Sequence, residues 1–169
     1  ISNMFSIYGK QINEVDTQHV RFAYTRGLAY FYKKFHQTYG DLALCYDSRN
    51  SWRRDIFYWY KASRRRDQKK SSINWASMYD IFTDVREEIA QEINVRSYQV
   101  TSCEADDIIA YLCNKATEKT VIVSSDKDFQ QLNGLNWIEQ YSPAHKKFLE
   151  CENPEAFLQE HILRGDSSD

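Results

Sequence analysis

Acidic residues stand directly after three short runs of the chain that have the character of strands. Asp47 follows Leu42–Tyr46, the pair Asp126 and Asp128 follows Val121–Val123, and Glu104, Asp106 and Asp107 follow Tyr98–Val100. The carboxyl ends of parallel strands share one edge of a sheet, so these acids are expected to converge. Carboxylates at close range raise one another's pKa, and hard divalent cations with oxygen ligands relieve that repulsion. The pattern predicts a metal-dependent enzyme that acts on phosphates.

Each acidic group also has a simpler explanation when it is taken alone. Acids in the first turn of a helix cap free backbone donors, and an Asp-x-Asp pair such as Asp126 and Asp128 also occurs in nucleotide-sugar enzymes and Toprim domains. Three acids within Glu104–Asp107 are more than a helix cap needs. The three groups together favour the metal site.

A basic segment separates the first acid from the others. Residues 53–70 hold eight Lys and Arg against two Asp, a net charge of +6, so the rest of this chain of net charge −2 carries −8. Aromatic residues, Trp52 and Phe57–Tyr60, precede the densest charge. Rings and cations together suit single-stranded nucleic acid, and a solvated charged loop beside a core aromatic helix is the alternative.

Length and composition fit one globular domain. The chain has 169 residues, of which 42% are hydrophobic, and it contains no run long enough to span a bilayer. Its four cysteines form no Cys-x-x-Cys pair, which favours reduced thiols in a cytosolic setting over a structural disulfide. The four histidines show no metal-ligand spacing, so we expect them in surface or packing positions.

Apolar spacing predicts alternating helices and strands that position these groups. We expect helices over 16–39, 52–60, 74–93 and 104–117, strands over 42–47, 95–101 and 120–125, and a short helix anchored by Phe129 and Leu132. Late strands are expected over 136–141 and 147–151, then a helix between Asn153 and Gly165. The basic stretch up to Ser72 lacks apolar periodicity and is expected to be mobile. This alternation predicts an α/β fold with a mainly parallel sheet flanked by helices.

Several of these motifs, in this order, resemble the phage and bacterial 5′-nuclease family, which includes flap endonucleases, and most of all its phage RNase H-type members. The motifs are Leu44–Asp47, Trp52–Asp55, Tyr58–Lys61, Glu104–Asp107, Ser124–Phe129, Tyr141–Lys147 and Gly165–Asp169. The resemblance implies a PIN-like, resolvase-like core over residues 1–169 that acts as a 5′→3′ exonuclease and flap endonuclease on RNA primers and 5′ flaps during DNA replication.

The resemblance also implies the role of each matching residue. Asp47, Asp126 and Asp128 would be catalytic, and two Mg²⁺ ions, with Mn²⁺ as an alternative, would be held by Asp47, Glu104, Asp106, Asp107, Asp126, Asp128, Asp166 and Asp169. Residues 53–72 would form a basic mobile arch around a 5′ single strand. The nucleic-acid contacts would be Trp52, Arg53, Arg54, Tyr58, Lys61, Arg64, Arg65, Arg66, Lys69 and Lys70.

Family members carry an acid on a first strand just before the position of Ile1, and a helical DNA-binding part beyond Asp169. The resemblance therefore implies a catalytically poor fragment of a cytoplasmic protein, host-cytoplasmic if phage-encoded. Its partners would be DNA and RNA–DNA hybrid with a 5′ single strand, together with a single-strand-binding protein or a sliding clamp, and no membrane. Two alternatives stay open: a PIN-like ribonuclease and a non-catalytic nucleic-acid-binding fragment.

Overall fold

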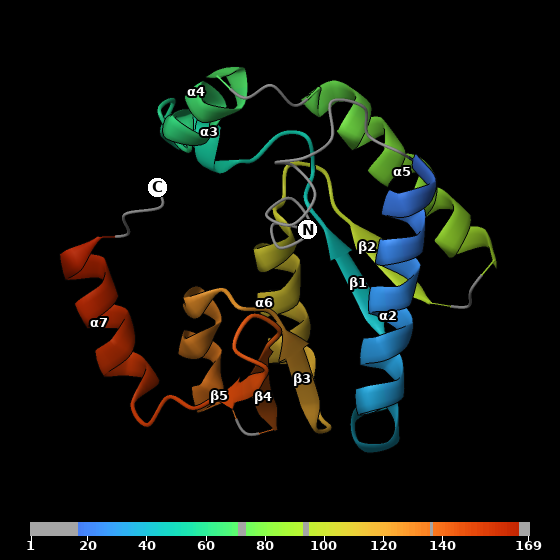
Figure 1. The fold of residues 1–169 in the computed structure, drawn as a ribbon. Helices are drawn as coiled ribbons and strands as arrows, with labels where there is room; N and C mark the ends of the chain where they lie inside the picture. The colour runs from blue at the N-terminus through green and yellow to red at the C-terminus, as the bar shows by residue number, and fades with distance from the viewer. Residues whose placement is uncertain (1–16, 71–73, 93–94, 136, 166–169) are drawn as a thin grey trace.

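The computed structural model describes residues 17–70, 74–92, 95–135 and 137–165, and Figure 1 shows their arrangement. The N-terminal half contains α2 (Thr17–Tyr39), β1 (Ala43–Tyr46), α3 (Arg53–Ile56), α4 (Ala62–Lys70), α5 (Trp75–Glu92) and β2 (Arg96–Gln99). The C-terminal half contains α6 (Ala105–Lys115), β3 (Thr120–Val123), the 3-10 helix η1 (Lys127–Gly134), β4 (Ile138–Ser142), β5 (Lys147–Leu149) and α7 (Pro154–Arg164). None of the described helices is long and apolar enough to cross a membrane.

The strands form two sheets. β1 pairs in parallel with β2 in the first sheet, and in the second β4 pairs in parallel with β3 and antiparallel with β5. Helix α6 contacts β1 and β2, and it shares an apolar cluster with β3 and β4, so it connects the two sheets. This arrangement confirms the predicted α/β fold with mainly parallel strand pairing.

Two apolar clusters hold the helices on the strands. Ile81, Val85 and Ile89 of α5 form one cluster with side chains of α2 and with Leu44 of β1. Cys113, Ile122, Phe129 and Ile138 join α6, β3, η1 and β4 in the other. Burial of one such aliphatic or aromatic side chain stabilises the fold by about 1.5–3 kcal/mol.

Aromatic side chains pack α2 against the second sheet, which is formed by β3, β4 and β5. Phe35 packs edge-on against Tyr141 of β4 and Phe148 of β5, with ring centroids 5.1 and 6.1 Å apart. Tyr141 is 3% exposed, and the Nζ atom of Lys34 lies 2.6 Å from its hydroxyl. The long helix α2 therefore packs against both sheets.

Most predicted elements are found, with shorter strands than expected. The stripe of the helix over 74–93 is confirmed at Met78, Val85 and Ile89, which are buried in α5. Gly40 follows α2 with φ +78°, the left-handed conformation that glycine adopts at the end of a helix. The predicted cap at Asp16 lies outside the described residues.

One prediction about residues 52–72 was wrong. The expected helix over 52–60 is limited to α3, because Phe57 has extended backbone (φ −133°) and the aromatic residues that follow are weak helix formers. The basic stretch, in which the sequence showed no apolar periodicity, contains helix α4 over Ala62–Lys70. Arginine, lysine, glutamine and alanine favour helix even without an apolar face. The mobility of this segment stays a prediction.

Candidate metal and nucleic-acid site

Asp47 links the end of β1 to the start of α6. Its Oδ1 accepts a hydrogen bond of 2.7 Å from the backbone nitrogen of Ala105, the first residue of α6. The side chain of Gln99, at the end of β2, donates to the Asp47 carbonyl at 2.8 Å. The ends of two neighbouring parallel strands are thereby joined to the helix that carries the next acids.

Glu104, Asp106 and Asp107, here called the α6 acid cluster, occupy the first turn of α6. Glu104 and Asp107 form a reciprocal capping box, in which the Asp107 carboxylate accepts from the Glu104 backbone nitrogen at 2.9 Å. Two of the three acids therefore satisfy free donors at the helix start. The capping alternative is correct for them, although it does not exclude a second role.

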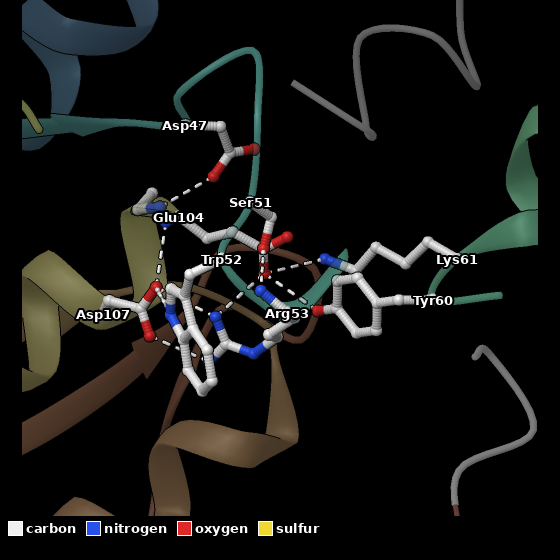
Figure 2. A network of polar contacts seen from close by, with 9 residues as sticks. Asp47, Ser51, Trp52, Arg53, Tyr60, Lys61, Glu104 and Asp107 are labelled. Atoms are coloured by element: carbon white, nitrogen blue, oxygen red, sulfur yellow. Dashed lines mark hydrogen bonds and ion pairs between the residues drawn. The ribbon is translucent and has the colours of Figure 1, made fainter. Parts of the chain in front are cut away.

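Arg53, the first residue of the basic segment, binds Asp107 together with the preceding Trp52 (Figure 2). The guanidinium of Arg53 donates to both carboxylate oxygens of Asp107, at 2.9 and 2.8 Å, and the indole nitrogen of Trp52 donates at 3.2 Å. The Arg53 guanidinium also lies 4.6 Å from the centre of the Trp52 ring. The hydrogen bonds from Arg53 hold the pKa of Asp107 below its usual value.

Tyr60 and Lys61 of the basic segment bind Glu104. Tyr60 Oη and Lys61 Nζ both donate to Glu104 Oε2, at 2.9 and 3.1 Å, and Arg53 lies 3.6 Å from the same oxygen. Burial acts to raise the pKa of Glu104, but the hydrogen bonds from Lys61 and Tyr60 outweigh it and leave the pKa below its usual value. This carboxylate is buried and ionised.

Asp106 has the opposite electrostatic environment. Partial burial of its carboxyl group, together with the negative charges of Asp126 and Asp47, raises its pKa to about 6, although the residue is exposed at the surface and Lys61 acts in the other direction. Acids from separate parts of the chain therefore act on Asp106. The convergence of the whole set of predicted acids stays a prediction.

Asp126 and Asp128, here called the β3 acid cluster, lie in the turn from β3 into η1. Asp126 Oδ1 accepts from the Asp128 backbone nitrogen at 3.0 Å and so caps η1. The fully buried Gln140 donates from Nε2 to the carbonyls of Ser124 and Asp126, at 3.0 and 2.6 Å. The hydrogen bonds that hold this turn join its backbone groups to the side chains of Asp126 and Gln140.

A chain of hydroxyl contacts supports the same turn from β4. Ser125 Oγ lies 2.9 Å from Ser142 Oγ, and Ser142 Oγ lies 2.9 Å from Nδ1 of His145. Ser142 is fully buried, and Ser125 Oγ also accepts from the backbone nitrogen of Ala144. The motifs Ser124–Phe129 and Tyr141–Lys147, which are separate in sequence, therefore form one supporting structure.

The structure places the predicted metal residues unevenly. In the described part of the chain, no three or more His, Cys, Asp or Glu side chains form a group that could hold a metal ion as they stand. Glu104 and Asp107 face cations, Asp128 faces His161, and Asp166 and Asp169 lie outside the described residues.

The predicted nucleic-acid residues also divide into two groups. Arg53 and Lys61 contact the α6 acid cluster, whereas Arg54, Tyr58, Arg66 and Lys70 are exposed. Trp52 does both, since it donates to Asp107 and remains 42% exposed. Arg64, Arg65 and Lys69 belong to α4, and their side chains lie outside the described part.

Sequence reasoning missed three residues that support the acids. Tyr60 binds Glu104, Gln140 holds the Asp126 turn, and His161 of α7 contacts Asp128. Tyr60 adjoins Lys61 within a quoted motif, so its position offered a signal. Gln140 and His161 offered none, because their partners are distant in sequence.

Comparison with known proteins shows which family this chain is similar to. A family described as 5′-3′ exonuclease, N-terminal resolvase-like domain, matches residues 4–160. Ribonuclease H of Enterobacteria phage T4 is 33% identical over 138 residues, which make up 78% of this chain and 45% of the phage protein. This chain therefore spans less than half of that relative.

Solved structures of phage T5 proteins share the fold. One T5 protein, co-crystallised with metal ions, superposes with a TM-score of 0.73 at 16% identity, covering 95% of this chain and 65% of its own. A T5 flap endonuclease, in a pseudo-enzyme-product complex with DNA and metal ions, gives a TM-score of 0.70 at 13% identity, covering 98% of this chain and 64% of its own.

Proposed function

This chain belongs to the 5′-3′ exonuclease family, whose N-terminal resolvase-like domain it carries, and on that premise we propose that it hydrolyses phosphodiesters with divalent metal ions. The predicted family resemblance is confirmed. The observation that carries the proposal is the pKa of Asp106, which is raised to about 6 by partial burial and then by the negative charges of Asp126 and Asp47. A bound divalent cation would offset the repulsion between these carboxylates and so stabilise their ionised forms.

The residues proposed to hold the ions are those of the sequence prediction. Asp47, Glu104, Asp106, Asp126 and Asp128 form the set, and we expect Asp107 to contribute least, because both of its carboxylate oxygens are engaged by Arg53. Mg²⁺, or Mn²⁺ in its place, would supply activation of water and stabilisation of the leaving oxygen. Asp166 and Asp169 remain proposed later ligands.

The proposed substrate is a duplex with a 5′ single strand, either a flap or an RNA primer. The exposed Arg54 and Tyr58 and the basic helix α4 offer phosphate contacts and a stacking surface near the acids. Relatives named ribonuclease H and flap endonuclease support this substrate class. A single-strand-binding protein or a sliding clamp stays a predicted partner.

We propose that residues 1–169 form the catalytic core and that residues 53–72 form its arch. Since the phage relative is more than twice as long as the matched region, the activity of the whole protein is part of the proposal.

The proposal is tested in the full-length protein by cleavage of a labelled 5′-flap duplex in Mg²⁺. Asp126→Asn should lower single-turnover cleavage by at least about a hundredfold while DNA binding stays within a few fold, because hydrolysis needs the ions and phosphate contacts do not. Glu118→Gln, which removes an exposed acid before β3, is the matched control. Near wild-type cleavage by Asp126→Asn would refute the assignment.

A non-catalytic nucleic-acid-binding role is the second candidate. The pairing of Glu104 and Asp107 with Arg53 and Lys61 favours it, since cations already occupy part of the predicted metal set. Absence of Mn²⁺ binding, with intact DNA binding, would select this candidate. Faster cleavage of single-stranded RNA than of a flap duplex would instead indicate a PIN-like ribonuclease.

A further inference from the structure

His161 of α7 contacts one of the proposed metal ligands. Its Nε2 lies 2.9 Å from Oδ1 of Asp128. An ionised carboxylate can only accept a hydrogen bond, so the imidazole nitrogen is the donor. The His161 side chain is 20% exposed and that of Asp128 is 52% exposed, so a largely covered ring holds a half-open carboxylate.

Helix α7 is fixed in a position that aims this ring. The helix packs against η1, its cap residue Asn153 accepts from the Ala156 nitrogen at 3.0 Å, and Pro154 lies close over Gly134. A β-carbon at Gly134 would approach Pro154 Cγ to 3.3 Å, which shows how tightly the two segments meet. The start of α7 is thus anchored to the end of η1.

Packing within α7 also fixes the imidazole itself. The ring of Phe157 stacks on that of His161, with centroids 5.5 Å apart and an interplanar angle of 15°. A ring stacked on one face and hydrogen-bonded at its edge keeps one orientation. His161 therefore constrains Asp128 instead of following it.

The contact with His161 engages only one of the two oxygens of the Asp128 carboxylate. A hydrogen bond at Oδ1 fixes the plane of the group, and the backbone of Asp128 is already held by Asp126. The second oxygen is then presented in a defined direction. Outer partners that orient ligating carboxylates in this way typically change metal affinity or activity by about 10–100-fold.

We propose that His161 is a positioning residue that orients Asp128 toward a divalent ion, so that α7 acts as the outer support of the β3 acid cluster. The inference rests on the proposed function, because it assigns Asp128 to a metal. It adds a residue that no acid pattern in the sequence indicates.

Mn²⁺ binding to the 169-residue chain, followed by the paramagnetic resonance signal of free Mn²⁺ at one pH, tests the proposal. His161→Phe keeps a ring for Phe157 and removes the donor, so its Mn²⁺ affinity should fall by about 10–100-fold. His161→Gln keeps a donor and should stay within a few fold of wild type. Glu160→Gln, an exposed change on the same helix, is the control.

A merely structural role for His161 would give a different result. It would lower the melting temperature of the metal-free chain in His161→Phe and leave Mn²⁺ affinity unchanged, which would overturn the proposal. If His161→Phe does not fold, His161→Leu, which also lacks a donor, takes its place. In an Asp128→Asn background, the loss of the His161 donor should have no further effect.

The same series separates the two proposals. If Asp128→Asn weakens Mn²⁺ binding and His161→Phe does not, the inference about His161 fails and the metal site stands. If Asp128→Asn itself leaves Mn²⁺ binding unchanged, the assignment of Asp128 to a metal fails and the inference fails with it.

Discussion

The two acid clusters follow strands of two different sheets and are stabilised differently. In the α6 acid cluster, Glu104 and Asp107 accept hydrogen bonds from Arg53, Tyr60, Lys61 and Trp52. In the β3 acid cluster, Asp126 caps η1 and Asp128 contacts a histidine. The basic segment is thus attached to one cluster and not, among the described contacts, to the other.

This difference shows that acids of one type can serve opposite purposes within a single helical turn. Hydrogen bonds from Arg53 lower the pKa of Asp107, whereas burial and neighbouring carboxylates raise that of Asp106 to about 6. Asp107 anchors the basic segment, whereas the Asp106 carboxylate would be stabilised by added positive charge. Adjacent Asp residues are therefore expected to respond oppositely to substitution.

The largest expected effect comes from substituting Asp106 and Asp107 one at a time. Asp106→Asn should weaken Mn²⁺ binding by at least about a hundredfold, more than the loss of an outer partner costs, and should stabilise the metal-free chain by removing a repelled charge. Asp107→Asn should change Mn²⁺ binding only a few fold and destabilise the chain. Calorimetric titration and urea unfolding measure both, and equal responses of the two variants would remove the distinction.

Removal of the anchoring cation should cost stability. Arg53→Met leaves the Asp107 carboxylate without its bidentate partner, and the two side chains are only 29% and 23% exposed. We expect the free energy of unfolding to fall by about 1–2 kcal/mol, or about 5–30-fold in the folding equilibrium. The exposed neighbour Arg54→Met should cost less than about 0.5 kcal/mol in the same urea titration. An equally small effect at Arg53 would show that the pair is only a surface contact.

The far part of the basic segment should act on nucleic acid and not on the acids. Replacing Arg64, Arg65 and Arg66 by Ala should reduce the log–log salt slope of single-strand binding by up to roughly two units, at about 0.7 per lost phosphate contact. Over a fourfold rise in salt this corresponds to about sixteenfold in affinity. Fluorescence anisotropy at several salt concentrations measures the slope, and an unchanged slope would assign α4 to a solvated surface role.

The smallest expected effect is the pH dependence of metal binding. Because the pKa of Asp106 is about 6 in the metal-free chain, a proton competes with the ion below that pH. Mn²⁺ affinity should fall about tenfold between pH 7 and pH 5. In Asp106→Asn this dependence should be lost.

The same shift has a defined sign for stability. The folded-state pKa of Asp106 lies above its unfolded value, so its contribution to the stability of the metal-free chain is present at low pH and declines as pH rises through about 6. Glu104 and Asp107 have lowered pKa values, so they contribute in the opposite direction. Their contribution to stability is present above the pKa of the unfolded chain and is lost as the pH falls through the folded-state pKa. Unfolding of Asp106→Asn against wild type over this range isolates the first contribution.

Strands and helices with strong apolar patterns followed from the sequence. The runs around Leu44 and Ile122 form parallel strands, and the stripe of Met78, Val85 and Ile89 faces the core. The acids at Asp47 and Asp126 also lie at strand ends as expected. Local periodicity was sufficient here because burial of one face decides these elements.

Residues 52–70 were harder to predict, because they bury little apolar surface. Helix α4 depends on the intrinsic helix propensity of its residues. Before it, the extended backbone of Phe57 and the positive φ of Lys61 (+52°) interrupt the helical conformation. Neither feature has a periodic signature. The mobility predicted for this segment is still to be measured.

The sequence alone determined the family, the α/β class and the set of acids at the strand ends, since residue type and local spacing carry all three. Only the tertiary structure decided which partner each acid has: Arg53 on Asp107, Lys61 on Glu104, His161 on Asp128, and other carboxylates on Asp106. A carboxylate's role depends on its burial and on nearby charges, and those neighbours come from segments about 20 to 60 positions away. Spacing along the chain contains no information about such contacts until the fold brings the segments together.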